Sequence, residues 1–216
     1  PDGSPIIGPA WGVKNFWLNE GHSFGVTAAG GAGWQLAEWI VEGEPTIDML
    51  GVDPRRFGPY ATRGYLKAKN EEAYALVFTP HFPDEERAAA RPLKRSPSYG
   101  RFAALGAVFG SVYGYERPNW FAPPGYEVSA AELAKPDVLL NDNHPQAKPG
   151  EKIREKWSFR RSNYFSFVGE ECRNVHENVG IQDMSAFAKA FVSGPGAEAW
   201  LDAILETGRR AIVAIV

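Results

Sequence analysis

A glycine-rich segment near the start of the chain places the strongest constraint on its fold. The segment GHSFGVTAAGGAGWQLAEWI, residues 21–40, contains five glycines within thirteen residues and continues as a helix-forming run. Glycine permits a positive φ angle and lets a second backbone or a ligand approach where a Cβ atom would clash. Trp34–Val41 has the apolar spacing of a helix that ends near Gly43, with Leu36 and Ile40 on one face. The pattern predicts a helix whose amino-terminal end is built from glycines.

Two explanations for these glycines stay open. Unpaired N–H groups and the positive end of the macrodipole make a helix N-terminus a site for a phosphate or an electron-rich carbonyl oxygen. The other explanation is close packing of the helix on a sheet. Gly25 and Gly30 have P-loop spacing, but Gly31 and Ala32 stand where that loop needs Lys and Ser or Thr. The dinucleotide fingerprint G-x-G-x-x-G does not occur in the sequence either.

Composition excludes several classes of protein. Of the 216 residues, 44% are hydrophobic and 23% are charged, which is typical of a globular protein rather than a disordered one. A net charge of -3 argues against nucleic acid as a partner. The sequence has no apolar run near the ~20 residues that span a bilayer, so no membrane partner is predicted. The single cysteine, Cys172, excludes an internal disulfide and suits a reducing compartment.

Both ends of the sequence read like interior parts of a longer chain. PDGSPIIGPA has no initiator Met and no leader composition, and it enters a short apolar strand at residues 5–8. A second strand is predicted at Phe16–Asn19, and Ile212–Val216 reads as a buried strand. We therefore expect a piece of a longer protein whose strands need partners from outside this segment.

The middle of the chain alternates helices with proline-rich segments. Apolar spacing of three and four predicts a helix that begins near Thr62. Residues 106–125, GAVFGSVYGYERPNWFAPPG, are predicted to form a strand followed by an aromatic, proline-rich loop. Residues 137–156 are polar and contain prolines, so they are predicted to be a surface excursion.

The last third is predicted to contain two helices separated by short strands. The first helix is indicated by an apolar stripe: Phe165, Val168, Cys172, Val175 and Val179. The segments GIQDM and AKAFVS, residues 180–184 and 188–193, are predicted strands. The second helix opens at Ser193 or Gly194 with Pro195 in its first turn. Cys172 and His176 lie one helical turn apart, but no second pair has ligand spacing, so no metal site is predicted.

Several blocks, in the same order, resemble the dimethylglycine and sarcosine dehydrogenase family of FAD-dependent amine oxidoreductases. They are DGSPIIGP, NFWLNEGHSFGVTAAGGAGWQLAEWIVEGEP, DPRRFG, YLKAKNEEAY and GYERPNWFAPPG. The likeness continues into a folate-binding, aminomethyltransferase-like domain through SFRRSNYF and GEECRNVHENVGIQDMSAFAKAFVSGPGAEAWLDAIL. It covers nearly the whole chain except residues 137–156.

The resemblance implies a mixed fold, α+β or α/β, in three parts. Residues 1–52 would form the end of an FAD-binding, D-amino-acid-oxidase-like domain. Residues 53–110 would form a small, mostly helical central domain. Residues 111–216 would begin the aminomethyltransferase-like α+β domain.

The resemblance also implies an activity. It is FAD-dependent oxidative N-demethylation of a small methylated glycine, dimethylglycine or sarcosine, with the one-carbon unit passed to tetrahydrofolate. The expected cofactors are FAD and tetrahydrofolate, the expected protein partner is an electron-transfer acceptor, and the expected compartment is the bacterial cytoplasm or the mitochondrial matrix. Two alternatives stay open: a folate-dependent aminomethyltransferase, which the flavin-like residues 1–52 disfavour, and a non-catalytic relative such as the regulatory subunit of pyruvate dehydrogenase phosphatase.

Matched to the family position by position, one segment would line the flavin: His22, Ser23, Phe24, Gly25, Val26 and Thr27. Backbone N–H groups at the helix start would face the flavin's pyrimidine carbonyls, where a helix N-terminus stabilises the negative charge of the reduced ring. The backbone, rather than the side chains, is expected to carry this role. A hydrogen-bonded lining role for His22 is favoured over a catalytic one, and no catalytic residue is assigned within the chain.

Other residues receive structural interpretations. Asp183 is expected to cap a turn, and Tyr115, Trp120 and Phe121 are expected to pack the domain, with pterin stacking as the minor alternative. Four arginines could attract the polyglutamate tail of folate, although ion-pair roles are commoner: Arg55, Arg56, Arg160 and Arg161.

Overall fold

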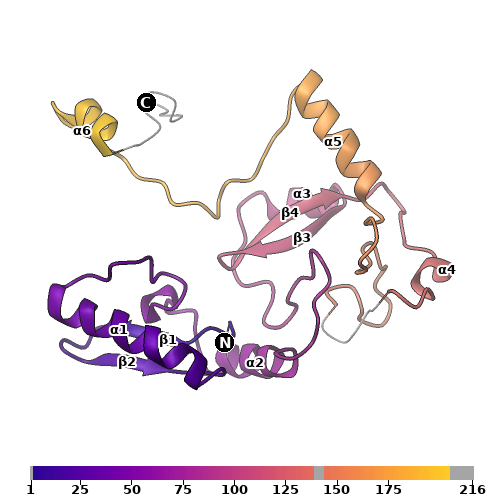
Figure 1. The fold of residues 1–216 in the computed structure, drawn as a ribbon. Helices are drawn as coiled ribbons and strands as arrows, with labels where there is room; N and C mark the ends of the chain where they lie inside the picture. Colours follow the sequence, from indigo (N-terminus) through magenta and orange to yellow (C-terminus); the bar gives the residue numbers. More distant parts are fainter. Residues whose placement is uncertain (1, 139–143, 205–216) are drawn as a thin grey trace. The chain divides into compact units, whose positions relative to one another are not determined.

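A computed structural model of the chain describes residues 2–138 and 144–204 (Figure 1). The chain divides into two compact units, Pro1–Asp183 and Met184–Val216. The described elements of the first unit are β1 (Ile6–Pro9), β2 (Trp17–Glu20), α1 (Val26–Glu42), the 3-10 helix η1 (Pro54–Arg56), α2 (Arg63–Ala75), α3 (Tyr99–Ala104), β3 (Ala107–Val112), β4 (Tyr115–Phe121), α4 (Ala130–Leu133) and α5 (Phe165–Glu177). The second unit contains α6 (Ala197–Ile204). No helix in the described ranges is long and apolar enough to cross a membrane.

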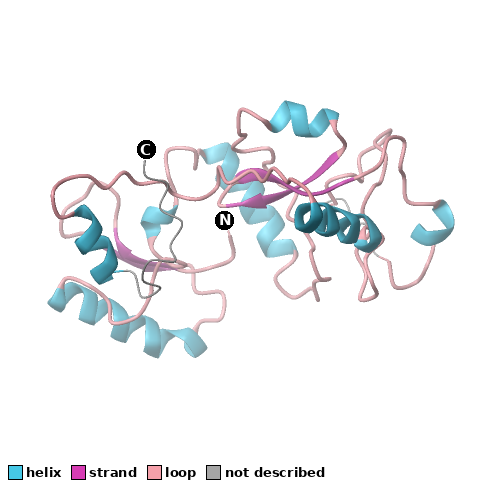
Figure 2. Cartoon of the chain, turned by 90° about the horizontal axis from the view of Figure 1, so that it is seen from above, coloured by secondary structure: helices cyan, strands magenta, loops and turns pink. Residues whose placement is uncertain are grey.

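The first part of the chain is a β-hairpin with α1 packed against it (Figures 1 and 2). β1 and β2 pair antiparallel, and the core between them and α1 includes Ile7, Ala32, Trp39 and Met49. Gly8 has a φ of 135°, and a Cβ atom placed there would lie 2.8 Å from the ring of Trp39. Glycine at this position therefore permits the hairpin to approach the helix. The two predicted strands are confirmed, each shifted by one residue.

Helix α1 begins at Val26, eight residues before the predicted start. Gly30, Gly31 and Gly33 consequently lie inside the helix, and Gly25 alone is its N-cap residue. The prediction was wrong because glycines carry no hydrophobic signal, so the apolar periodicity became visible only at Trp34.

The buried face of α1 matches the prediction only in part, since Leu36 packs against the core as predicted. Ala32 and Trp39 are buried, whereas Ile40, predicted to face the core, is 49% exposed. Tertiary packing against the hairpin decides the face, because Trp39 and not Ile40 is on the side of Gly8. The predicted end is confirmed, since Gly43 caps the helix in the left-handed conformation.

Helix α2 starts as predicted, because the Thr62 hydroxyl accepts a hydrogen bond from the Tyr65 N–H at 3.3 Å. Its buried Glu72 accepts hydrogen bonds from the N–H groups of Ala88 and Ala89 at 2.7–2.8 Å. Lys69 donates to the same carboxylate at 3.2 Å. The carboxylate thus fixes the extended segment after α2 to the helix.

The second sheet is the antiparallel hairpin β3–β4, with a register shift between Val108 and Phe109. Residues Tyr115–Phe121, predicted as a loop, form β4 instead. Pro118 pairs at the register shift, where a missing N–H is tolerated, so proline does not break this strand.

The core of this sheet is built on Trp120, which is 1% exposed. Its ring stacks on Tyr164 and Phe167, with centroids 5.3 and 5.8 Å away, and packs edge-on against Tyr126. Helix α5 is held to the sheet by Glu171, which accepts a hydrogen bond from the Phe121 N–H at 2.8 Å. The packing role predicted for Trp120 is confirmed.

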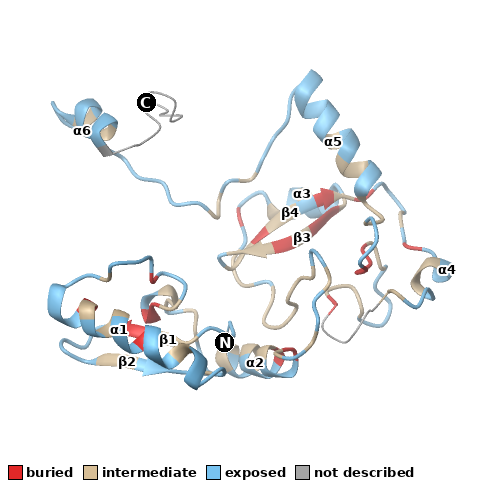
Figure 3. Ribbon diagram, viewed as in Figure 1, coloured by how far each residue is buried: buried red, intermediate tan, exposed pale blue. Residues whose placement is uncertain are grey.

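Only part of the apolar stripe predicted on α5 packs against the core (Figure 3). Val168 packs on the β3–β4 core, but Phe165, Cys172 and Val175 are exposed. The stripe is narrower than the pattern indicated, because Phe167 replaces Phe165 as the residue that faces Trp120.

Two predictions in the last third are wrong for the described residues. Residues 180–184 and 188–193, which the structure describes, form no strand. Helix α6 begins at Ala197, so Pro195 precedes the helix rather than occupying its first turn. The predicted strand Ile212–Val216 lies outside the described residues.

Candidate functional site

The residues matched to the flavin site form the turn between β2 and α1. Gly25, the N-cap of α1, has φ 48° and ψ -113°, a conformation that only glycine adopts readily. No side chain caps the helix, and its first turn contains no acidic residue. The N–H groups of Thr27 and Ala28 make long bonds of 3.2 Å to turn carbonyls. The positive end of a 17-residue helix is thus left without a charged side-chain partner.

This helix start is open enough for a ligand. A Cβ atom placed on Gly25 would meet no described atom of the chain within 4 Å. Phe24 and Val26, on either side of it, are 66% and 93% exposed. An apolar ring with polar carbonyl oxygens on one edge fits such a surface, so these residues are compatible with the flavin of FAD.

His22 lies beside the turn. Its Nε2 is 2.6 Å from the Asn19 side-chain oxygen, and its Nδ1 is buried without a partner among the described residues. This geometry suits a ring held in place by Asn19, and the role of His22 stays a prediction, as do those of Ser23 and Thr27.

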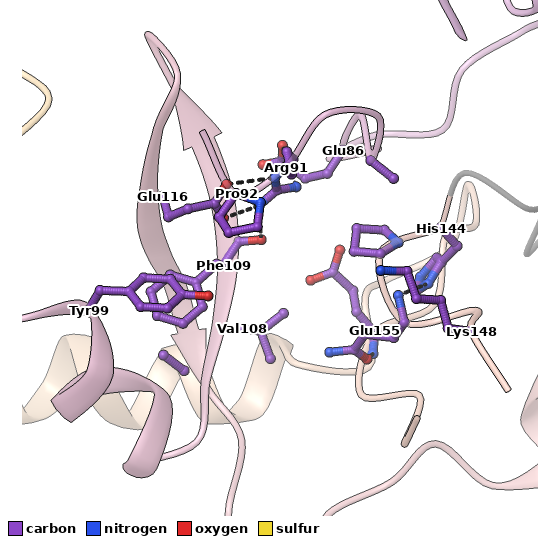
Figure 4. Close-up of a pocket in the computed structure, with 14 residues that line it drawn as sticks. Glu86, Arg91, Pro92, Tyr99, Val108, Phe109, Glu116, His144, Lys148 and Glu155 are labelled. Atoms are coloured by element: carbon purple, nitrogen blue, oxygen red, sulfur yellow. Dashed lines mark hydrogen bonds and ion pairs between the residues drawn. The ribbon is translucent and has the colours of Figure 1, made fainter. Parts of the chain in front are cut away.

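A second candidate site is a cavity of about 250 Å³ in the first unit (Figure 4). On its β3–β4 side, Arg91 forms an ion pair with Glu116, with Arg91 Nη2 2.7 Å from Glu116 Oε2 and Nε 3.0 Å from Oε1. Arg91 also donates to the carbonyl of Phe109 at 2.9 Å. Burial lowers the pKa of Arg91, but the hydrogen bonds and charge of Glu116 outweigh burial and raise it.

The opposite side of the cavity comes from residues 144–155, part of the predicted surface excursion. That prediction was wrong at the two ends of this stretch, where His144, Glu155 and the adjacent Lys156 are buried, and it is confirmed for residues 148–152, which are exposed. Glu155 accepts hydrogen bonds from the indole N–H groups of Trp120 and Trp157 at 3.1 and 3.2 Å. Burial raises the pKa of Glu155, and the two indole hydrogen bonds oppose that shift.

His144 is the most deeply buried polar residue here, at 2% exposure. Its Nδ1 accepts a hydrogen bond from the Gln146 N–H at 3.1 Å, and its ring lies 4.3 Å from that of Trp157. Burial lowers the pKa of His144 to about 4. The ring is therefore neutral at physiological pH.

The low pKa of His144 predicts an acid-sensitive stability. The folded protein keeps this ring neutral down to about pH 4, whereas an unfolded histidine binds a proton below about pH 6.5. The contribution of neutral His144 to the free energy of unfolding is therefore fully present above pH 6.5. It is lost as the pH drops towards 4, by up to about 3 kcal/mol. Urea unfolding of the full-length protein at several pH values should show this loss, and His144→Phe should flatten it. If the dependence of stability on pH is the same in that variant, the prediction is contradicted. Glu155 does not mimic the effect, because its raised pKa makes the folded protein more stable, not less, as the pH falls.

The ion pair predicts a stability effect of its own. Glu116→Gln removes the charge that Arg91 faces in a buried position, so the free energy of unfolding should drop by about 1.5–3 kcal/mol. Glu71→Gln is the matched control, because its pair with Lys67 is exposed and 3.8 Å long and should contribute less than about 0.5 kcal/mol. Equal urea midpoints for the two variants would show that the buried pair contributes no more than a surface pair.

None of the cavity residues Arg91, Glu116, His144 and Glu155 is singled out by the sequence pattern. Glu155 stands between Arg154 and Lys156 in a run that reads as solvated. The one usable signal was the pair of tryptophans, whose indole N–H groups need acceptors when buried.

The remaining candidates have structural partners. Asp183 accepts a hydrogen bond from the Ser96 hydroxyl at 2.6 Å, which joins distant segments, and its turn-capping role stays a prediction. The arginines take the expected ion-pair roles: Arg55 with Asp53 at 2.6 Å, Arg56 with Asp2 at 2.8 Å and Arg160 with Asp137 at 2.5 Å, while Arg161 lies over Phe165. Within the described ranges, no three His, Cys, Asp or Glu side chains gather as a metal site.

Comparison with known families matches two adjacent domain models. Residues 42–96 match the FAD dependent oxidoreductase central domain, and residues 98–211 match the GCVT N-terminal domain. The second match alone covers more than half of the chain. The predicted boundaries at residues 53 and 111 stay predictions.

Curated relatives resemble the chain over most of its length. Mitochondrial dimethylglycine dehydrogenase of Rattus norvegicus is 34% identical over 94% of this chain and 21% of the relative. Mitochondrial sarcosine dehydrogenase of Homo sapiens is 31% identical over 90% of this chain and 21% of the relative. The mitochondrial pyruvate dehydrogenase phosphatase regulatory subunit of Mus musculus is 30% identical over 92% of this chain and 20% of the relative.

The chain thus spans about a fifth of the length of these relatives. Its two family models follow one another along the sequence, and the same stretch recurs in each relative. The chain belongs to the dimethylglycine and sarcosine dehydrogenase family, in which an FAD dependent oxidoreductase central domain is followed by a GCVT N-terminal domain.

Proposed function

We propose that the protein containing this chain catalyses FAD-dependent oxidative N-demethylation of a small methylated glycine, dimethylglycine or sarcosine. The relatives named as dehydrogenases of these compounds support this substrate class. The adjoining GCVT N-terminal domain supports transfer of the one-carbon unit to tetrahydrofolate. An electron-transfer protein would reoxidise the flavin.

The observation that carries the flavin proposal is the glycine-capped, uncharged N-terminus of α1. Bound FAD supplies the acceptor for the hydride that leaves the substrate carbon next to nitrogen. The backbone at Gly25 and Val26 would present the positive end of the helix to the carbonyl edge of the flavin, where a negative charge is stabilised. Phe24 and Val26 would cover the ring and exclude water, and His22, held by Asn19, would border it.

The first test is the visible absorption spectrum of the full-length protein. A bound oxidised flavin gives the protein a visible absorption band, and anaerobic addition of dimethylglycine or sarcosine should bleach that band. Added tetrahydrofolate should capture the one-carbon unit that is otherwise released as formaldehyde. A colourless protein, or a flavin that neither amine reduces, would refute the proposal.

A non-catalytic regulatory role is the second candidate, because one relative is a phosphatase regulatory subunit. That role predicts no reduction of a flavin by either methylated glycine, together with a change in the activity of a partner phosphatase. The same two measurements therefore separate the candidates. The glycine-capped start of α1, with no acidic residue in its first turn, favours the flavoenzyme.

A further inference from the structure

The cavity of Figure 4 contains a buried donor that the protein does not use. Because Nδ1 of the neutral His144 ring accepts the Gln146 N–H, the ring proton must be on Nε2. The Glu155 backbone interacts with this ring, but no described atom meets the geometry of a hydrogen bond to Nε2, and the side chain is 2% exposed. A buried donor without a partner is costly, so its position on the wall of a cavity indicates a bound group that accepts a hydrogen bond.

The same wall contains an acceptor with capacity to spare. Each Glu155 oxygen accepts one indole N–H, and a carboxylate oxygen has room for a further hydrogen bond. Glu86 and Asp84 add negative charge near Glu155. This part of the cavity therefore favours a group that carries both N–H donors and positive charge.

Lys148 supplies a positive charge of its own. It lines the cavity and is exposed, and its side chain makes no hydrogen bond or ion pair with the part of the chain that the structure describes. Figure 4 shows Lys148, His144 and Glu155 on one side of the cavity, facing Arg91 and Glu116. Arg91 is not available to a ligand, because Glu116 and the Phe109 carbonyl occupy its guanidinium.

The volume limits the ligand. At about 250 Å³ the cavity is smaller than the roughly 300–1,000 Å³ typical of pockets for drug-sized ligands, so it favours a small ligand such as a free amino acid.

We propose that this cavity binds a small α-amino acid as a zwitterion, with its ammonium group donating to Glu155 and its carboxylate accepting from His144 and Lys148. A simple cation would leave His144 Nε2 and Lys148 without a partner, and a simple anion would be repelled by Glu155. The site uses none of residues 22–27, so it is a binding site distinct from the proposed flavin surface and does not depend on the proposed function.

Calorimetric titration of the full-length protein with glycine tests the ligand class. Glycine should bind with a dissociation constant in the millimolar range or tighter. Methylamine lacks the carboxylate and acetate lacks the ammonium group, so each should bind at least about tenfold more weakly. Absence of glycine binding, or methylamine or acetate binding as tightly as glycine, would overturn the proposal.

Three variants assign the binding to this cavity. Lys148→Glu changes an exposed residue, so the protein should fold, and glycine affinity should fall about tenfold or more. Lys152→Glu makes the same charge change at a neighbouring exposed lysine that does not line the cavity, and it should leave affinity unchanged. His144→Phe removes the donor and should also weaken binding. Glycine binding that survives Lys148→Glu unchanged would place the ligand elsewhere, for example at the proposed flavin site, and would refute this assignment.

Discussion

Replacement of Gly25 by Val in the full-length protein should weaken FAD binding by at least about tenfold, equivalent to about 1.4 kcal/mol. The physical reason is twofold. Gly25 has φ 48°, which a β-branched residue adopts only at a cost of about 1–3 kcal/mol. A valine side chain would also occupy the open space above the helix N-terminus, where the ligand is proposed to lie. The flavin-to-protein ratio after purification, and the FAD concentration that restores activity, measure the effect.

Gly43→Val is the matched control at the other end of the same helix. Gly43 has φ 90°, so valine introduces comparable backbone strain there, and a Cβ atom at Gly43 also meets no described atom within 4 Å. This variant should lose a similar amount of stability and still retain its flavin. Normal flavin content in Gly25→Val, or equal flavin loss in both variants, would remove the assignment of the β2–α1 turn to the cofactor.

Trp120→Ala should produce the largest loss of stability, about 3–5 kcal/mol. The side chain is 1% exposed and fills the space between β4 and α5, where Tyr126, Tyr164 and Phe167 surround it. Its removal leaves a cavity and also removes one of the two indole hydrogen bonds to Glu155. Since domains are stable by only about 5–15 kcal/mol, soluble yield should fall and the urea midpoint should shift strongly.

Trp11→Ala provides the comparison for that variant. Trp11 is 61% exposed, so its replacement should change the free energy of unfolding by no more than about 0.5 kcal/mol. If both tryptophan variants unfold at the same urea concentration, the aromatic cluster around Trp120 is not the core of this part of the chain.

Local signals in the sequence predicted several elements well. Thr62 starts α2 through its own hydroxyl, and Gly43 ends α1 through a left-handed conformation, so both boundaries depend on residues within one turn. The family was also readable from the sequence, because its blocks are contiguous and keep their order. The six residues of the candidate flavin surface are consecutive, so their proximity needed no tertiary information.

The tertiary structure alone decided the features that depend on distant partners. Tyr115–Phe121 forms a strand because β3 supplies its hydrogen bonds and a register shift accommodates Pro118. Glu155 is buried because Trp120, 35 residues earlier, and Trp157 donate to it.

The sequence by itself thus determined several local boundaries and the family, and it led to the proposal of a contiguous flavin surface, since each of these depends on a short stretch. The cavity that joins Arg91, Glu116, His144 and Glu155 was decided by the fold. A charged residue in a polar run reads as solvated until a buried donor or an opposite charge from another segment is placed beside it. That pairing is set by packing between segments, which the pattern along one segment does not contain.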